Sequence, residues 1–180
     1  MKRYLIAATF AAALGVAAAA HAALEIGAPA PDFTAQAALG GQPFTFRLHE
    51  ALAKGPVVLY FYPAAFTQGC SLEARSFADA IEQYKALGAT VVGVSADDME
   101  TLKKFSMADC AGKFAVAADA DRKVMQRYDA AHERNPARAQ RISYVITPDG
   151  KILYEYSDMN PDHHVANTLK ALRDWKARQG

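Results

Sequence analysis

One long apolar segment, Pro-Val-Val-Leu-Tyr-Phe-Tyr at residues 56–62, restricts the possible folds of this chain more than any other feature. A strand that is apolar on both faces usually lies in the centre of a sheet that is covered on both sides. Pro63 ends the segment, a loop follows over residues 64–69, and a helical spacing of apolar residues begins at Cys70. We therefore expect a buried central strand that leads through a short loop into a helix.

Further strands are predicted by short apolar runs that lie between turn residues. Residues 90–94 form a second buried run, and a Pro-Asp-Gly turn at 148–150 joins residues 142–146 to residues 151–156 as a hairpin. The remaining predicted strands span residues 43–48 and 114–117, and residues 129–140 are predicted to form a polar loop.

Helices are predicted between these strands from apolar residues that recur every three or four positions. The first helix runs from Cys70 to a cap at Gly88, and the second starts at Asp98 and closes near Gly112. A short helix is expected at 122–128, and a final one begins at Pro161 and carries Val165, Leu169, Leu172 and Trp175. This alternation, closed by a hairpin and a helix, predicts a three-layer α/β sandwich with a central mixed β-sheet.

The first 22 residues differ in composition from the rest of the chain. A basic start at residues 1–3 is followed by an uncharged apolar run at 5–20 and by Ala-His-Ala at 20–22, which is the pattern of a secretory signal peptide and its cleavage site. A membrane anchor is the alternative, but the run is alanine-rich and short for a spanning helix. We therefore expect a signal peptide over residues 1–22, a single domain over 23–180, a periplasmic or secreted location, and no stable membrane association after cleavage.

The charge balance argues against a polyanionic partner. The chain has 20 Lys and Arg against 19 Asp and Glu, and loss of Lys2 and Arg3 with the leader leaves 18 against 19. Proteins that bind nucleic acid usually carry a marked basic excess or a basic stripe. We expect no nucleic-acid partner, and we interpret Arg134 and Arg138 as charges on a solvated loop.

The chain contains two cysteines, Cys70 and Cys110. Outside a reducing cytosol, such a pair suggests a structural disulfide first. A bond that forms and breaks during a catalytic cycle is the other possibility. The cysteine content alone leaves both readings open.

Cys70 lies where the central strand gives way to a helix. The first turn of a helix presents unpaired N–H groups and the positive end of its dipole, which favour a thiolate over a thiol. The alternative is a small buried apolar residue, as many free cysteines are. The neighbouring Gln68, Gly69 and Ser71 are not typical of a core, so the local sequence favours a reactive thiol.

The loop before Cys70 contains a complete motif. Pro63, Thr67 and Cys70 satisfy the spacing Pro-x-x-x-Thr-x-x-Cys, and the turn reads Phe-Thr-Gln-Gly-Cys. This segment resembles the active-site motif of the peroxiredoxins of the AhpC/TSA family, in particular the peroxiredoxin Q or bacterioferritin comigratory protein branch. The resemblance extends from about residue 28 to 175, including Val-Ser-Ala-Asp at 94–97, and implies a thioredoxin-like fold.

The resemblance implies a role for each matching residue. Cys70 is expected to be the peroxidatic cysteine, Thr67 to hydrogen-bond the thiolate and the substrate, and Pro63 to shape the pocket and exclude water. Arg141 matches the arginine that stabilises the thiolate and polarises the peroxide. By position alone Arg141 is a solvated charge at a strand end. Glu73 stands where this branch often has a glutamate that could orient Arg141, although acidic residues are common at helix starts.

The resemblance also concerns what happens after Cys70 becomes a sulfenic acid. Many members of the branch carry a second cysteine five positions later on the same helix, where this chain has Arg75. Others carry it on the helix that starts here near Met99. Ser106 stands at about that place, and Cys110 follows one turn later on the same face. Cys110 is thus expected to resolve Cys70 as an intramolecular disulfide after local unfolding. The alternative is a single-cysteine enzyme that uses an external thiol.

The resemblance also implies a substrate and a reductant. A peroxiredoxin needs a hydroperoxide, hydrogen peroxide or an organic one, and a thioredoxin-like or small-thiol reductant, and a monomer or weak dimer is expected. No cofactor is expected, because the chain has no glycine-rich phosphate loop. No metal site is expected either, since His163 and His164 are adjacent and cannot face one ion from a regular helix. Asp119 and Asp121 are expected to cap the following helix.

Two rival functions are less compatible with these residues. A disulfide exchanger of the same fold would carry Cys-x-x-Cys, whereas Cys70 is followed by Ser, Leu and Glu. A non-catalytic binding or holdase module on a degenerate fold would be expected to have lost Thr67, Cys70 or Arg141. All three residues are present.

Overall fold

Strand β3 (Val57–Phe61) lies near the middle of a seven-stranded sheet in the computed structural model, which describes residues 23–179. The strand order is β2-β1-β5-β4-β3-β8-β9, with β3, β4 and β5 parallel and the other pairs antiparallel. The predicted mixed sheet is therefore confirmed. The other strands of the sheet are β1 (Thr34–Leu39), β2 (Gln42–Arg47), β4 (Thr90–Ser95), β5 (Ala115–Ala118), β8 (Ile142–Ile146) and β9 (Ile152–Ser157).

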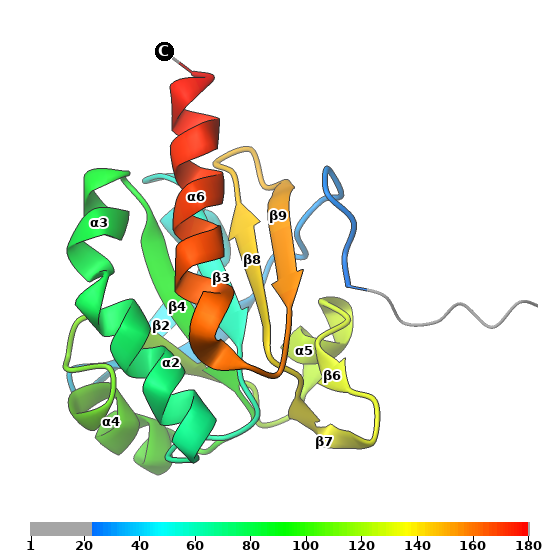
Figure 1. The fold of residues 1–180 in the computed structure, drawn as a ribbon. Coiled ribbons are helices and arrows are strands. Elements are labelled where there is room, and N and C mark those ends of the chain that lie inside the picture. The colour runs from blue at the N-terminus through cyan, green and yellow to red at the C-terminus, as the bar shows by residue number, and fades with distance from the viewer. Residues whose placement is uncertain (1–22, 180) are drawn as a thin grey trace, which may run out of the picture.

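Helices cover both faces of this sheet (Figure 1). Side chains of β3 alternate between the two sides, because Val58 and Tyr60 pack in one core cluster and Leu59 in the other. The first cluster is covered by α2 (Gln68–Asp79), α3 (Ile81–Ala86), α4 (Met99–Ala108) and α6 (His164–Ala177), the last preceded by a 3-10 turn, η1 (Pro161–His163). The second is covered by α1 (Leu48–Leu52) and α5 (Lys123–Arg127). The three predicted layers are thus present.

Two local predictions need correction, and two elements of the structure were not predicted. The helix expected from Cys70 to Gly88 is interrupted at Ala80, which separates α2 from α3, although Gly88 does end α3 with φ +74°. Residues 129–140 are not a plain loop, because β6 (Ala131–His132) and β7 (Asn135–Ala139) form a two-stranded ribbon. Its side chains are mostly exposed, so the polar composition reflects solvent contact rather than absence of strands. Strand β1 and helix α1 were not predicted.

The N-terminal ends of α4 and α5 are held by the aspartates that were predicted to cap them. The Asp98 carboxylate accepts a hydrogen bond from the Thr101 N–H at 2.8 Å, and the Asp119 carboxylate accepts from the N–H groups of Val124 and Met125 at 3.0 and 2.8 Å. Among residues 23–179 no helix is both long and apolar enough to cross a membrane. The predicted signal peptide at residues 1–22 lies outside the described residues.

Candidate active site

The loop that joins β3 to α2 is held in place by Asp97 at the end of β4. Its carboxylate accepts hydrogen bonds from the Ala65 N–H at 2.7 Å and from the Ser95 hydroxyl at 2.8 Å. Phe66 in this loop has φ +61°, in the left-handed region that a bulky residue rarely adopts. The parallel strands β3 and β4 therefore bring Pro63 and Thr67 to a fixed position at their carboxyl ends.

Cys70 lies in the first turn of α2, as predicted. Thr67 is the N-cap residue, and Cys70 itself is 1% exposed. The Thr67 hydroxyl donates to the Ala64 carbonyl at 3.0 Å, which leaves its oxygen lone pairs as acceptors. Cys70 thus belongs to the N-terminal turn of α2, whose first N–H groups lack helical partners.

Arg141 reaches the Cys70 sulfur from the sheet. It stands immediately before β8, is 4% exposed, and places Nη2 at 3.4 Å from Cys70 Sγ. Its Nε donates to the Met159 carbonyl at 3.0 Å. A Cβ at Gly69 would lie 3.0 Å from Nη2, so the glycine before Cys70 leaves room for the guanidinium.

Glu73 holds the other side of this guanidinium. It lies one turn after Cys70 on α2, is fully buried, and its Oε2 accepts a hydrogen bond from Arg141 Nη1. Burial raises the pKa of the Glu73 carboxyl to about 8, and the Arg141 charge opposes that rise. Arg141 is therefore the one cation shared by two acidic groups, Cys70 and Glu73.

His164 stands behind Glu73 and was not anticipated as part of this site. The imidazole is fully buried, with Nε2 2.9 Å from the Asp158 carbonyl and Nδ1 2.8 Å from the Ser143 hydroxyl. A carbonyl only accepts, so Nε2 carries the proton and Nδ1 accepts from Ser143. Nδ1 is also 3.6 Å from Glu73 Oε1. Burial lowers the pKa of His164 to about 4, which keeps it neutral at physiological pH.

Cys110 follows α4 directly, near the predicted end of that helix. It is fully buried, and both cysteines are free thiols. Both belong to the core cluster on the α2 face of the sheet. Burial raises the pKa of the Cys110 thiol, and the neighbouring Asp109 carboxylate adds to that rise. In this conformation Cys110 is a protonated thiol that is sequestered from solvent.

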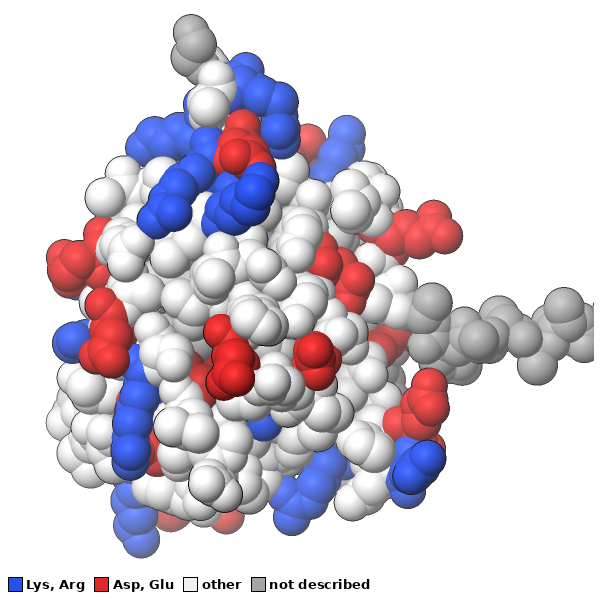
Figure 2. Space-filling model, viewed as in Figure 1, with Lys and Arg blue, Asp and Glu red and all other residues white. Residues whose placement is uncertain are grey.

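The surface around the Cys70 loop is apolar in character. Phe66 and Leu72 are each 50% exposed, and Met159, whose carbonyl holds Arg141, is 52% exposed. Figure 2 shows that the surface over α2 and α6 carries few charges at its centre, while basic side chains gather at the C-terminal end of α6.

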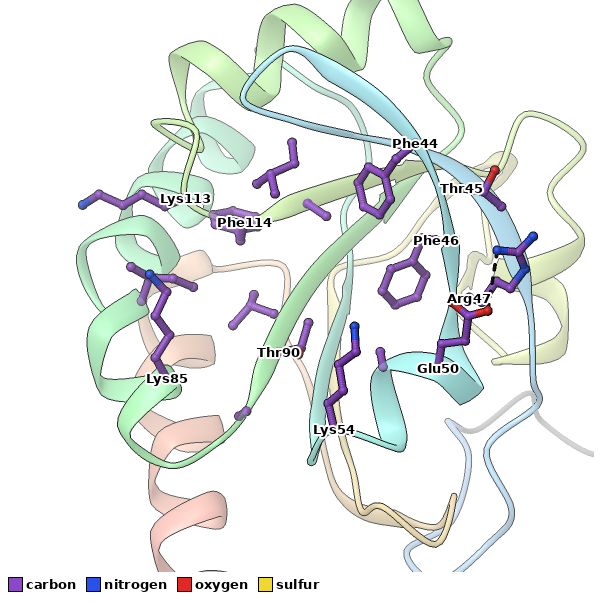
Figure 3. A pocket seen from close by; sticks show the side chains of 16 residues that line it. Phe44, Thr45, Phe46, Arg47, Glu50, Lys54, Lys85, Thr90, Lys113 and Phe114 are labelled. Atoms are coloured by element: carbon purple, nitrogen blue, oxygen red, sulfur yellow. Dashed lines mark ion pairs between the residues drawn. The ribbon is translucent and has the colours of Figure 1, made fainter.

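A pocket of about 380 Å³ lies elsewhere on the molecule (Figure 3). It is bounded by Phe44 and Phe46 of β2, by Phe114, and by Thr90 at the start of β4. Because β3 and β4 are parallel and Cys70 follows the far end of β3, this pocket is at the opposite edge of the sheet from the thiol. The pocket is therefore too far from Cys70 in the fold to be the catalytic site, whatever its size.

The described residues contain no metal-binding cluster. Within residues 23–179, no group of three or more His, Cys, Asp or Glu side chains is arranged to hold an ion. The structure thus brings together Cys70, Arg141 and Glu73, with Pro63 and Thr67 in the loop beside them. It places Cys110 in the same core cluster without a bond.

Comparisons with known proteins agree with this geometry. The AhpC/TSA family model matches residues 26–155. A chloroplastic peroxiredoxin Q from Triticum aestivum is 35% identical over 120 residues, which cover 66% of this chain and 55% of that protein. The peroxiredoxin Bcp of Bacillus subtilis (strain 168) is 31% identical over 156 residues, 84% of this chain and 96% of that one. The chain thus spans about half the length of the plant relative and nearly all of the bacterial one.

Solved structures share the architecture. The crystal structure of peroxidoxin BcpB from Mycobacterium tuberculosis superposes with a TM-score of 0.76 at 29% identity, covering 84% of this chain and 97% of that chain. This likeness confirms the predicted thioredoxin-like fold.

Proposed function

The chain belongs to the AhpC/TSA family of peroxiredoxins, and from that membership we propose that it is a thiol peroxidase that reduces hydrogen peroxide and organic hydroperoxides at Cys70. The observation that supports this most directly is the Arg141 guanidinium, with Nη2 3.4 Å from the Cys70 sulfur. A buried, permanently charged group at that distance stabilises a thiolate and cannot lose its own proton.

The reaction begins when the Cys70 thiolate attacks the terminal oxygen of a hydroperoxide. The S–O bond forms as the O–O bond breaks, and the leaving alkoxide or hydroxide takes up a proton to become an alcohol or water. Arg141 stabilises the negative charge that passes from sulfur to oxygen. The Thr67 oxygen accepts a hydrogen bond from the peroxide, and Pro63 limits the access of water.

Glu73 acts as a positioning residue in this scheme. Its contact with Nη1 and the Met159 carbonyl's contact with Nε leave Nη2 directed at Cys70. A guanidinium held at two of its three nitrogens is pre-organised for the third contact, which favours catalysis.

The oxidised enzyme is resolved by Cys110 in this proposal. The burial of both thiols supports a step in which part of the core opens before a Cys70–Cys110 disulfide forms. A thioredoxin-like protein or a small thiol then reduces the disulfide, and the apolar surface around Phe66 and Leu72 is where it would dock. The alternatives are direct reduction of the sulfenic acid by an external thiol, or a non-catalytic holdase role.

Export is part of the same proposal. The signal-peptide pattern at residues 1–22 supports a periplasmic or secreted enzyme, which would need a reductant outside the cytosol. The domain is proposed to act as a monomer or weak dimer.

Intact-mass analysis after one equivalent of hydrogen peroxide tests the proposal. A loss of about 2 Da in the mature wild type, with a trappable sulfenic acid in Cys110→Ser, supports resolution by Cys110. A gain of about 16 Da in the wild type would instead support the single-cysteine alternative. An unchanged Cys70 in both proteins would contradict the peroxidase function itself.

A further inference from the structure

Asp109, the residue before Cys110, is tied to the helix that carries Cys70. Its side chain is 4% exposed and accepts hydrogen bonds from the Ser71 hydroxyl at 2.8 Å and from Arg75 Nε and Nη2 at 2.9 and 2.6 Å. Ser71 and Arg75 both belong to α2, so these bonds join the end of α4 to α2 (Figure 1). We call these three side chains the Asp109 latch.

The latch satisfies a carboxylate that is almost completely buried. Ser71 donates to Oδ2 and Arg75 donates twice to Oδ1, so each oxygen has a partner. Charge-assisted bonds of this kind are about twice as strong as neutral ones. A buried carboxylate that loses such partners is costly, so the latch favours the closed arrangement of α4 and α2.

The turn that carries Cys110 is less favourable by itself. Ala111 has φ +49°, in the left-handed region where a residue with a Cβ is strained. The Cys110 N–H donates to the Phe105 carbonyl at 3.2 Å, and its carbonyl accepts from the Lys113 N–H at 2.9 Å. The turn is therefore held against the core by local backbone hydrogen bonds, by the burial of Cys110 and by the latch.

Cys110 is shielded from solvent while the turn is closed. It is fully buried and is not bonded to Cys70, and a disulfide forms only in a specific mutual orientation of the two cysteines. Burial and the Asp109 charge also favour the thiol over the attacking thiolate. Opening of the turn would break the latch and expose Cys110 to solvent in one motion, because Asp109 and Cys110 are adjacent in the chain.

We propose that the Asp109 latch must open before Cys110 reaches the sulfenic acid of Cys70, and that Ser71 and Arg75 thereby set the rate of resolution. In that step the Cys110 thiolate attacks the Cys70 sulfur, the S–S bond forms, the S–O bond breaks, and hydroxide leaves and takes up a proton as water. The inference rests on the proposed resolving role of Cys110. If the latch opens more slowly, the sulfenic acid persists for longer and a second peroxide molecule has more time to oxidise it to sulfinic acid.

The test compares Arg75→Met with wild type in a rapid-quench experiment followed by intact mass. The Arg75 side chain is 63% exposed, so methionine is compatible with the fold while it removes the charged donor. We expect the disulfide to close about tenfold faster, the factor that corresponds to about 1.4 kcal/mol. Ser71→Ala is expected to act in the same direction with a smaller factor. At high peroxide, both variants should accumulate less sulfinic acid than wild type.

Two controls isolate the effect. Lys103→Met removes a charge from α4 that pairs with Glu100 instead of Asp109, and it should leave the rate unchanged. In a Cys110→Ser background, Arg75→Met should not alter the conversion of sulfenic to sulfinic acid, since that background has no resolving thiol.

The outcomes separate the latch from the proposed function. A wild type that closes its disulfide while Arg75→Met closes at the same rate or more slowly would overturn the latch. A wild type that stops at a stable sulfenic acid would refute resolution by Cys110, and the latch would fall with it.

Discussion

Removal of either member of the Arg141–Glu73 pair should destabilise the protein far more than removal of both. Arg141 is 4% exposed and Glu73 is fully buried, so either single change leaves a buried polar group without its partner. Loss of one partner of such a pair costs about 3–5 kcal/mol, whereas replacement of both by apolar residues of similar volume is often nearly neutral. The matched variants are Arg141→Met, Glu73→Leu and the double variant.

The two single variants should also differ from each other. In Arg141→Met the remaining carboxyl can take up a proton, because burial already raises the pKa of Glu73 to about 8. In Glu73→Leu the remaining guanidinium cannot lose one. We expect the free energy of unfolding to fall by about 3 kcal/mol in the first case and by about 5 kcal/mol in the second, with the double variant within about 2 kcal/mol of wild type.

Urea unfolding at neutral pH, followed by far-UV circular dichroism, measures these differences. Lys170→Met removes an exposed cation from the Lys170–Asp174 pair and should cost less than about 1 kcal/mol. If the free energy of unfolding of the double variant fell by the sum of the two single losses, the two residues would not form a coupled buried pair. Because Arg141 is gone, the double variant should regain stability but not rapid reaction with peroxide, which separates its structural from its catalytic contribution.

Three further predictions concern His164, Gly93 and Thr67. As pH falls from 6.5 to about 4, the unfolded chain takes up a proton at His164 before the folded chain does. The free energy of unfolding of wild type, measured relative to His164→Gln by urea titrations across that range, should therefore fall by about 3 kcal/mol. A difference between the two proteins that stays constant with pH would contradict the lowered pKa of His164. Gly93→Ala should lower the free energy of unfolding by about 2 kcal/mol in the same assay, because the new Cβ would lie 2.7 Å from the ring of Tyr60. That ring is 1% exposed and stacks on Phe77, so it has little room to move. An unchanged urea midpoint would refute this packing. Thr67→Val should slow the reaction of Cys70 with peroxide about tenfold in a stopped-flow measurement, because it removes one hydrogen bond of about 1 kcal/mol or slightly more. A wild-type rate would remove Thr67 from the mechanism.

The strand-to-helix turn was predictable because its determinants are local. Residues 56–62 are apolar throughout, Pro63 cannot continue the strand's pairing, and the helical spacing begins at once. Strand β1 was missed for the converse reason. Its sequence, Thr-Ala-Gln-Ala-Ala-Leu, has little intrinsic strand preference, and its pairing with β2 and β5 makes it a strand.

The meeting of Arg141 with Cys70 could not be derived from local pattern. The two residues are 71 positions apart, and by position alone Arg141 suggests a solvated charge at a strand end. The family resemblance supplied the expectation, and the antiparallel pairing of β8 with β3 brings the two together. His164 carried no local signal either, since its environment is formed by Ser143 of β8 and by the Asp158 carbonyl.

The Asp109 latch belongs to the same class of features. Ser71 and Arg75 are a helical turn apart on α2, but nothing in their spacing indicates that they share a carboxylate 34 to 38 positions later. Side-chain networks that join distant elements arise from packing, which local periodicity does not encode.

The rate constant for hydrogen peroxide with the Cys110→Ser variant tests the central claim most directly, because Cys70 is then the only thiol. Stopped-flow measurement should give a value about a thousandfold or more above that of a free cysteine thiolate at the same pH, the scale expected from pre-organised charge beside the reacting sulfur. Cys70→Ser should lack this reaction. A Cys110→Ser protein that reacts no faster than free cysteine, or a Cys70→Ser protein that keeps the fast reaction, would contradict the assignment of Cys70 as the peroxidatic centre.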